Sequence, residues 1–333
     1  MTGGQDVMAR LLAAGPTRVM GIVNVTPDSF SDGGTYADPA DAVRAGLRMV
    51  ADGADLVDVG GESTRPGAAR VDVAEERGRV LPVVAELAAR GAAVSVDTTR
   101  AAVAEAALDA GAVLVNDVSA AAEPDLLALV AERDAYYVLM HSRGASVDMA
   151  KRAYYGDVVA DVLAELGRRL DVVLAAGISP RRVIIDPGIG FAKRFEHNWS
   201  LLAHLDAFAA LGRPLLVGTS RKSFLGALPA GPGRDPARLG EADPAGPAPR
   251  PVEEREDATQ ATTTLLAYQG VWCVRVHAVR PAVDAVRVVG AWVAAAERDL
   301  GPSRTGEALD SWPEGPAARG TGNAGLGHRA RGA

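Results

Sequence analysis

Cysteine is nearly absent from the sequence, since Cys273 is the only one in 333 residues. One cysteine excludes an intramolecular disulfide and a zinc cluster built on cysteines. Residues 1–18 contain no sustained apolar stretch after a basic start, so we expect no signal peptide. No apolar run approaches the roughly 20 residues that a membrane helix needs. We therefore expect a cytoplasmic protein that does not enter a membrane.

Positive charge and lysine are also scarce. The formal net charge is −7, with 35 basic residues against 42 acidic ones, so the sequence predicts no broad basic surface for nucleic acid. Three of the basic residues are lysines, Lys151, Lys193 and Lys222, and four residues in the chain are asparagines. In a chain that uses these two types so rarely, their presence inside a motif suggests a chemical requirement.

Short apolar runs alternate with helical patterns along most of the chain. Eight runs rich in β-branched residues are predicted strands, namely residues 18–25, 55–60, 92–97, 112–117, 136–141, 182–188, 214–220 and 271–277. Strands that are apolar throughout and alternate with helices form parallel sheets covered on both faces. Eight such units predict an α/β fold of the (β/α)8 TIM barrel type. An open doubly wound sheet is the alternative, but no GxGxxG follows the first strand.

Changes in composition mark the boundaries of this barrel. We predict a single barrel domain over residues 18–297, preceded by an N-terminal extension over residues 1–17. Residues 228–251 carry seven prolines and four glycines, too many for a helix or strand, and are predicted to be an insertion before the eighth strand. Residues 298–333 have almost no large apolar side chains and are predicted to be a disordered tail.

Polar residues stand at the ends of the predicted strands, where barrel enzymes carry their catalytic groups. One set combines two carboxylates, an amide and an ammonium group: Asp97, Asn116, Asp186 and Lys222. These groups suit a flat polar heterocycle that has N–H donors and ring acceptors. A lone aspartate at a strand end more often caps the next helix. Several polar residues at the ends of different strands, all at the same end of the barrel, instead favour a ligand-binding site.

A second set gathers where the eighth strand meets the first two. It consists of Asn24, Arg65, Arg275 and His277. Cations beside a neutral oxygen ligand suit a phosphate or diphosphate with Mg²⁺. Together the two sets indicate a heterocycle that carries a phosphate-type leaving group. The sequence has no GxSxG or HExxH motif, and Cys273 lies inside a predicted strand, so no paired nucleophile and base is indicated.

Seven motifs, in order along the chain, resemble those of the dihydropteroate synthase family. They are MGIVNVTPDSFSDGG (20–34), DVGGESTRPGA (58–68), SVDT (95–98), ND (116–117), DPGIGFAK (186–193), GTSRKSF (218–224) and RVHAV (275–279). The family has a (β/α)8 barrel and usually forms homodimers. The resemblance implies a transferase of folate biosynthesis that condenses 6-hydroxymethyl-7,8-dihydropterin diphosphate with 4-aminobenzoate, giving 7,8-dihydropteroate and pyrophosphate. Sulfonamides compete with the aminobenzoate of this family.

The family motifs also imply a role for individual positions. The implied pterin-binding residues are Asp97, Asn116, Met140, Asp186, Phe191 and Lys222. The implied diphosphate contacts are Thr64, Arg65, Arg275 and His277, with Asn24 as the Mg²⁺ ligand. The implied aminobenzoate contacts are Thr64, Pro66, Arg221 and Ser223. Phe30 and Asp32 lie on what resembles the family's mobile first loop, and with Asp97, Asp186 and Lys222 they make up the implied catalytic set.

Two alternatives to a synthase remain open. A methyltetrahydrofolate-dependent methyltransferase shares the barrel and the pterin pocket, but its substrate has no diphosphate and does not require STRPG, SRKS or RVH. A non-catalytic pterin-binding paralogue would have lost groups from the loops or the anion pocket, and these groups are present. For a synthase, the amine of aminobenzoate is already a nucleophile near neutral pH and needs no strong base. The difficult step is then the breaking of the C–O bond to diphosphate, so we expect an SN1-like loss of diphosphate.

Overall fold

The computed structural model describes residues 2–26, 38–63, 70–144, 149–228 and 249–300. The predictions for Phe30, Asp32, Thr64, Arg65 and Pro66 lie outside these residues, as do those for most of the 228–251 insertion and for the tail beyond residue 300. The chain divides into two units, Met1–Val289 and Gly290–Ala333. The first unit contains all the described strands.

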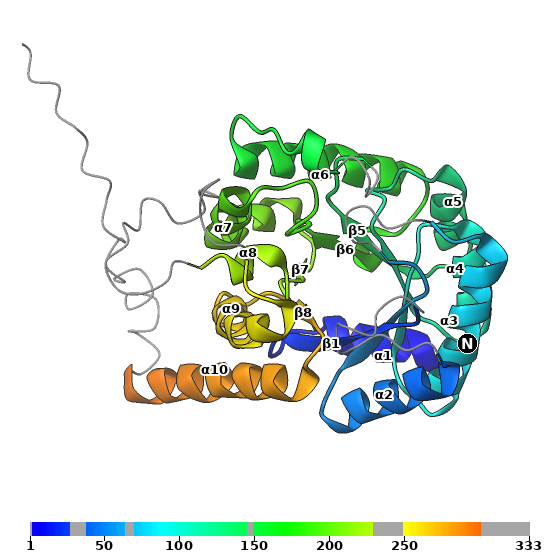
Figure 1. Cartoon of the computed structure of the whole chain (residues 1–333), viewed down its shortest axis with the longest axis horizontal. Helices are drawn as coiled ribbons and strands as arrows, with labels where there is room; N and C mark the ends of the chain where they lie inside the picture. Colours follow the sequence, from blue (N-terminus) through cyan, green and yellow to red (C-terminus); the bar gives the residue numbers. More distant parts are fainter. Residues whose placement is uncertain (1, 27–37, 64–69, 145–148, 229–248, 301–333) are drawn as a thin grey trace, which may run out of the picture. The chain divides into compact units, whose positions relative to one another are not determined.

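Eight parallel strands form the centre of the first unit (Figure 1). They are β1 (Arg18–Asn24), β2 (Leu56–Gly60), β3 (Val94–Asp97), β4 (Leu114–Asp117), β5 (Tyr136–Met140), β6 (Val183–Asp186), β7 (Leu216–Val217) and β8 (Cys273–Val276). Hydrogen bonds join them in the order β6-β5-β4-β3-β2-β1-β8-β7. A parallel bridge between Ile185 and Leu215 links β6 to the residue before β7 and closes the ring. The predicted barrel is confirmed.

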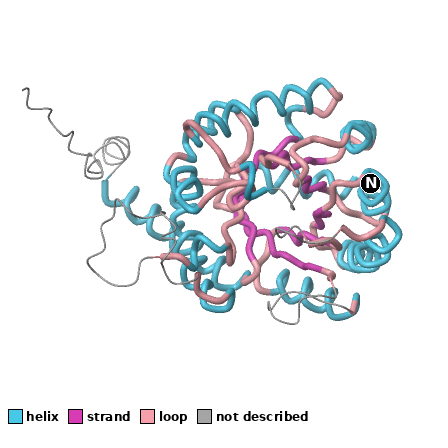
Figure 2. Tube along the Cα trace, turned by 45° about the horizontal axis from the view of Figure 1, so that its top comes forward, coloured by secondary structure: helices cyan, strands magenta, loops and turns pink. Residues whose placement is uncertain are grey.

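Helices follow the strands, and those of the first unit, including α10 as far as Val289, surround the ring of strands (Figure 2). They are α2 (Pro39–Ala51), α3 (Val73–Ala89), α4 (Ala101–Asp109), α5 (Pro124–Glu132), α6 (Val158–Ala175), α7 (Phe195–Ala203), α8 (Ser223–Gly226), α9 (Glu256–Tyr268) and α10 (Val279–Leu300). Aspartates that precede α2, α3 and α6 accept hydrogen bonds from the first-turn N–H groups; these are Asp38, Asp72 and Asp157. Such caps satisfy N–H groups that have no partner within a helix, so the sequence fixes these helix starts locally. None of the described helices is both long and apolar enough to cross a membrane.

The core has two parts. The larger lies between the strands and the surrounding helices, and the smaller fills the barrel near the strand starts, where Met20, Leu56 and Leu114 are at most 1 % exposed. Helix α1 (Thr2–Leu12), in the predicted N-terminal extension, adds the fully buried Met8 to the smaller part. The Leu11 carbonyl accepts a hydrogen bond from Trp272 Nε1 at 2.8 Å. Helix α1 therefore packs where the strands begin, and the other end of the barrel is left for the site.

Candidate active site

The carboxyl ends of the middle strands bring three of the four predicted heterocycle ligands into buried positions. Asp97 and Asn116 are register partners on β3 and β4, and Asp186 ends β6 beside Met140 of β5. The three polar residues are between 3 and 8 % exposed. Lys222 follows β7 and precedes α8. Because parallel strands in a barrel all end at one face, polar residues far apart in sequence converge there.

Arg275 connects these residues to a carboxylate that the sequence did not single out. Its Nη2 lies 2.8 Å from Asp97 Oδ2, and its Nε lies 2.7 Å from Asp58 Oδ2. Asp58 Oδ2 also accepts a hydrogen bond of 2.9 Å from Asn116 Nδ2. Arg275, which the sequence assigned to diphosphate, thus lies against the predicted heterocycle ligands as well. The available signal for Asp58 was a carboxylate within the otherwise apolar strand LVDVG.

Burial dominates the electrostatics of these groups. It raises the pKa of Asp97 to about 7, an effect that the neighbouring Arg275 opposes. Burial also raises the pKa of Asp186, opposed mainly by Lys222, and lowers the pKa of Lys222 to about 8, opposed by Asp186. Perturbed groups that gather in this way are typical of functional sites.

The raised pKa of Asp97 predicts a particular pH dependence of stability. The folded state retains the Asp97 proton between about pH 4 and about pH 7, where an unfolded aspartate has lost it, so this group makes the protein less stable as pH rises through that window. Asp97→Asn removes the titration. The free energy of unfolding of the variant relative to wild type should therefore increase between about pH 5 and about pH 8, as measured by urea denaturation. Parallel pH profiles for the two proteins would contradict this expectation.

The DPGIG segment after β6 requires its glycines. Gly188 has φ +68°, and a side chain there would overlap the His141 carbonyl oxygen. Gly190 has φ +81°, and a Cβ there would lie 2.8 Å from Lys222 Cδ. This left-handed backbone, which glycine adopts at little cost, lets the Gly188 N–H donate to Asp186 Oδ1 at 2.7 Å. Ala192 also has a positive φ of 49°, a backbone conformation that glycine adopts at less cost.

Phe191 and Lys222 form one wall of this region. Lys222 Nζ lies 5.0 Å from the centre of the Phe191 ring, within the range of a cation–π contact, and it donates to the Ile189 carbonyl. Met140 is 3 % exposed at the end of β5. The predicted pterin walls therefore lie at the same end of the barrel as the polar ligands.

The other described residues predicted for diphosphate and aminobenzoate follow β7 or β8, whereas Arg275 lies within β8. The ring of His277 pairs through Nδ1 with Ser220 Oγ at 2.9 Å. Arg221 donates through Nε to Glu256 Oε2 at 2.9 Å, and Ser223 is exposed at the first position of α8. The described aminobenzoate candidates, Arg221 and Ser223, are thus two positions apart in sequence and lie at the same end of the barrel as the other predicted ligands.

Asn24 ends β1 and is the predicted Mg²⁺ ligand. A Cβ placed on Gly60 would lie 3.8 Å from Asn24 Oδ1 and 3.4 Å from Asp97 Cβ, so the glycine leaves free space next to this amide oxygen. Within the described residues no group of three or more His, Cys, Asp or Glu side chains could hold a metal. One neutral oxygen fits Mg²⁺ only as part of a shell completed by substrate phosphate oxygens and water.

A second, partly buried network joins the segment after β6 to the end of β5 and to α6. Lys193 Nζ lies 2.9 Å from His141 Nδ1 and donates to the Phe191 carbonyl at 3.0 Å. His141 Nε2 lies 3.0 Å from Glu165 Oε2. Burial lowers the pKa of His141 to about 4, so the neutral ring donates to Glu165 through Nε2 and accepts from Lys193 through Nδ1. The sequence placed His141 at a strand end, but nothing in the sequence linked Lys193 or Glu165 to it.

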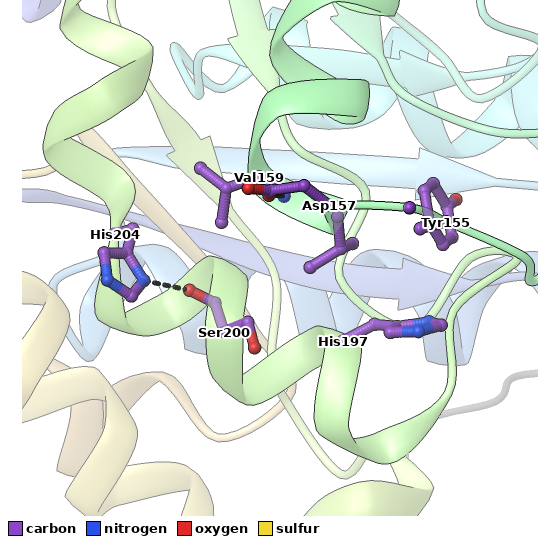
Figure 3. Close-up of a pocket in the computed structure, with 8 residues that line it drawn as sticks. Tyr155, Asp157, Val159, His197, Ser200 and His204 are labelled. Carbon is purple, nitrogen blue, oxygen red and sulfur yellow. Dashed lines mark hydrogen bonds between the residues drawn. The ribbon is translucent and has the colours of Figure 1, made fainter. Parts of the chain in front are cut away.

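A cavity of about 500 Å³ lies elsewhere, between the start of α6 and helix α7. Its lining includes Tyr155, Asp157, His197 and His204 (Figure 3). His204, which directly follows α7, hydrogen bonds through Nδ1 to the Ser200 carbonyl of that helix at 2.8 Å. The lining residues belong to helices and the segment before α6, not to strand ends, so we assign this cavity no part in the chemistry.

Comparison with known proteins relates this geometry to a family. Residues 20–277 match the family described as pterin binding enzyme. Dihydropteroate synthase of Mycobacterium leprae is 52 % identical over 284 residues, which cover 85 % of this chain and 95 % of that protein. The structure of Xanthomonas albilineans dihydropteroate synthase with 4-aminobenzoic acid has a TM-score of 0.72 and 44 % identity, covering 84 % of this chain and 94 % of that one. The same enzyme in complex with 7,8-dihydropteroate has a TM-score of 0.69 and 41 % identity, covering 84 % and 94 %.

Proposed function

The chain belongs to the pterin-binding enzymes and, among them, to the dihydropteroate synthases, and from this premise we propose which of its residues carry out each part of the reaction. A dihydropteroate synthase joins 4-aminobenzoate to 6-hydroxymethyl-7,8-dihydropterin diphosphate and releases pyrophosphate. The observation that carries the proposal is the buried convergence of Asp97, Asn116 and Asp186 next to Lys222 at the strand ends.

The pterin ring binds among these groups. Asp186 and Asp97 accept hydrogen bonds from ring N–H and amino donors, and the ammonium of Lys222 donates to ring acceptors. Met140 and Phe191 cover the apolar faces of the ring. Since each buried polar group has a complementary partner on the pterin, a ligand that lacks one of those partners leaves a group unpaired and binds less tightly.

The diphosphate binds toward Arg275 and His277, with Arg65 and Thr64 as further contacts predicted from the sequence. Asn24 would hold Mg²⁺ together with diphosphate oxygens, and the bound ion would supply positive charge to the leaving group. Arg275 provides a fixed cation that stabilises charge on the departing oxygen. These residues therefore act mainly on the bond that breaks.

The substitution takes place at the exocyclic carbon of the pterin. The C–O bond breaks first and its electron pair leaves with pyrophosphate, while the carboxylates of Asp97 and Asp186 stabilise the positive charge that spreads over the ring. The amine of 4-aminobenzoate then forms the C–N bond and loses a proton to solvent. Arg221, Ser223, Thr64 and Pro66 are the proposed contacts of the aminobenzoate, and Phe30 and Asp32 the proposed contacts from the first loop.

Release of pyrophosphate by the purified protein tests this function. Release should require both the pterin diphosphate and 4-aminobenzoate, and it should match the formation of dihydropteroate mole for mole. A protein that binds pterin but releases no pyrophosphate would instead be the non-catalytic paralogue. A protein that transfers a methyl group from methyltetrahydrofolate would be the methyltransferase.

Substitution of Asn24 tests the Mg²⁺ proposal. Asn24→Ala should raise the Mg²⁺ concentration needed for half-maximal turnover by about tenfold, in line with the loss of roughly 1.4 kcal/mol from one coordinating oxygen. Excess Mg²⁺ should then restore most of the turnover. An Mg²⁺ titration that leaves the variant's midpoint at the wild-type value would assign Asn24 another role.

We also propose that the enzyme is a cytoplasmic homodimer, as the family resemblance implies. Light scattering coupled to size-exclusion chromatography measures the mass directly. A mass of one chain, at protein concentrations where the enzyme is fully active, would contradict the dimer.

A further inference from the structure

Asp58 is a fully buried carboxylate directly beneath the proposed substrate site. It lies in the middle of β2, where it is 0 % exposed and pairs in register with Ile22 and Ser95. Its side chain reaches Asn116 of β4 and Arg275 of β8, so it faces the barrel interior. Burial of a carboxylate is costly unless charged or hydrogen-bonding partners compensate, and here a guanidinium and an amide do so.

One oxygen atom of Asp58 serves two residues with different proposed tasks. Oδ2 accepts from Asn116 Nδ2 at 2.9 Å and from Arg275 Nε at 2.7 Å. Because Asp58 Oδ2 accepts this bond, Asn116 turns its NH₂ group toward Asp58 and its carbonyl oxygen away from it. Arg275 is held at a second point by Asp97, 2.8 Å from its Nη2.

We propose that Asp58 is a positioning residue that sets the hydrogen-bonding polarity of Asn116 and anchors Arg275. With one N–H of its amide bound to Asp58, Asn116 turns its carbonyl oxygen toward the pterin and selects a ring N–H donor at that point. The same oxygen holds Arg275 between the pterin and the diphosphate. Asp58 thus couples recognition of the heterocycle to the position of a cation that acts on the leaving group. This inference rests on the proposed roles of Asn116 and Arg275.

Conservative and non-conservative substitutions separate hydrogen bonding from charge. Asp58→Ala removes the acceptor, so the amide of Asn116 is free to turn over and Arg275 keeps one anchor. Affinity for 6-hydroxymethylpterin, measured by calorimetry on the full chain, should fall by about tenfold or more, the usual consequence of one mispaired buried group. Asp58→Asn keeps an oxygen for both donors, and its NH₂ group takes the place of Oδ1, which has no hydrogen-bond partner within the described residues. Its affinity should stay within about threefold of wild type.

A double-mutant cycle distinguishes positioning from a general loss of structure. If Asp58 acts through Asn116, the double variant Asp58→Ala with Asn116→Ala should bind the pterin no more weakly than Asn116→Ala alone. Asp55→Asn is the matched control, because Asp55 precedes the same strand and its carboxylate accepts from the Val19 N–H at 2.8 Å, at the opposite end of the barrel. This control should bind pterin and pyrophosphate like wild type. If Asp58→Ala fails to fold, Asp58→Ser, whose hydroxyl is too short to reach Asn116, is measured in its place.

The outcomes are distinct. Non-additive losses together with rescue by Asp58→Asn support the inference. Additive losses, unchanged pterin affinity in Asp58→Ala, or a loss of tenfold or more in a folded Asp58→Asn would overturn it. Unchanged affinity in Asn116→Ala would instead remove the proposed role of Asn116 in pterin binding, which is a failure of the site assignment and not of Asp58 alone.

Discussion

Asp186→Asn should lower kcat/KM for the pterin diphosphate by about 30- to 1,000-fold, which corresponds to about 2–4 kcal/mol of transition-state stabilisation. Asp186 is 7 % exposed, and its Oδ1 is already used by the Gly188 N–H at 2.7 Å. Asparagine has one acceptor oxygen, so it satisfies either Gly188 or the pterin, and its NH₂ group faces a donor at the other place. The variant also lacks the negative charge that supports the ammonium form of Lys222.

Steady-state kinetics and direct binding of pterin diphosphate measure this effect together. The control is Asp171→Asn, the same chemical change at an exposed position of α6, which should leave both quantities at their wild-type values. A folded Asp186→Asn enzyme with wild-type affinity and turnover would reduce Asp186 to a structural role in the turn that follows β6.

Met8→Asp should cause the largest loss of stability. Met8 is 0 % exposed in the cluster that contains Met20, Leu56 and Cys273 near the strand starts. Truncation of a buried methionine costs about 2–5 kcal/mol, and a carboxylate without a partner costs more, so the loss should exceed about 4 kcal/mol. For a chain of this size we expect the melting temperature to fall by about 10 °C or more.

Thermal unfolding of two companion variants isolates the cause. Ala9→Asp places the same group on the exposed side of α1 and should shift the melting temperature little, whereas Met8→Leu keeps the volume and apolar character and should cost less than about 1.5 kcal/mol. Equal melting temperatures for Met8→Asp and Ala9→Asp would mean that α1 does not contribute to the core in solution.

The sequence by itself determined the barrel and the chemistry of its strand ends. Strands that are apolar throughout have no polar face that could be exposed to water. Because they alternate with helices, the fold they predict is a parallel sheet covered by helices. The eighth such run pairs with the first and the seventh and so joins the two ends of the barrel sequence. The aspartate, asparagine and lysine residues at the strand ends could be predicted to lie near one another because all parallel strands of a barrel end at one face. Strand lengths were less well predicted. The run 214–220 is a strand only over Leu216–Val217, since Pro214 donates no hydrogen bond and the Thr219 carbonyl accepts from the Lys222 N–H in a turn.

Only the tertiary structure decided which polar groups meet inside the barrel. Asp58 and Arg275 are 217 positions apart, and His141 and Lys193 are 52 apart, so no local pattern marks either pair. Asp58 and Arg275 meet because strand order and register bring their strands together inside the barrel, where an unpaired charge would be unstable. His141 and Lys193 meet because the segment after β6 passes beside the end of β5. The packing of Met8 into the barrel likewise depends on a space that exists only after the strands have closed. Local sequence specifies the residue types at the site, whereas closure of the ring specifies their partners.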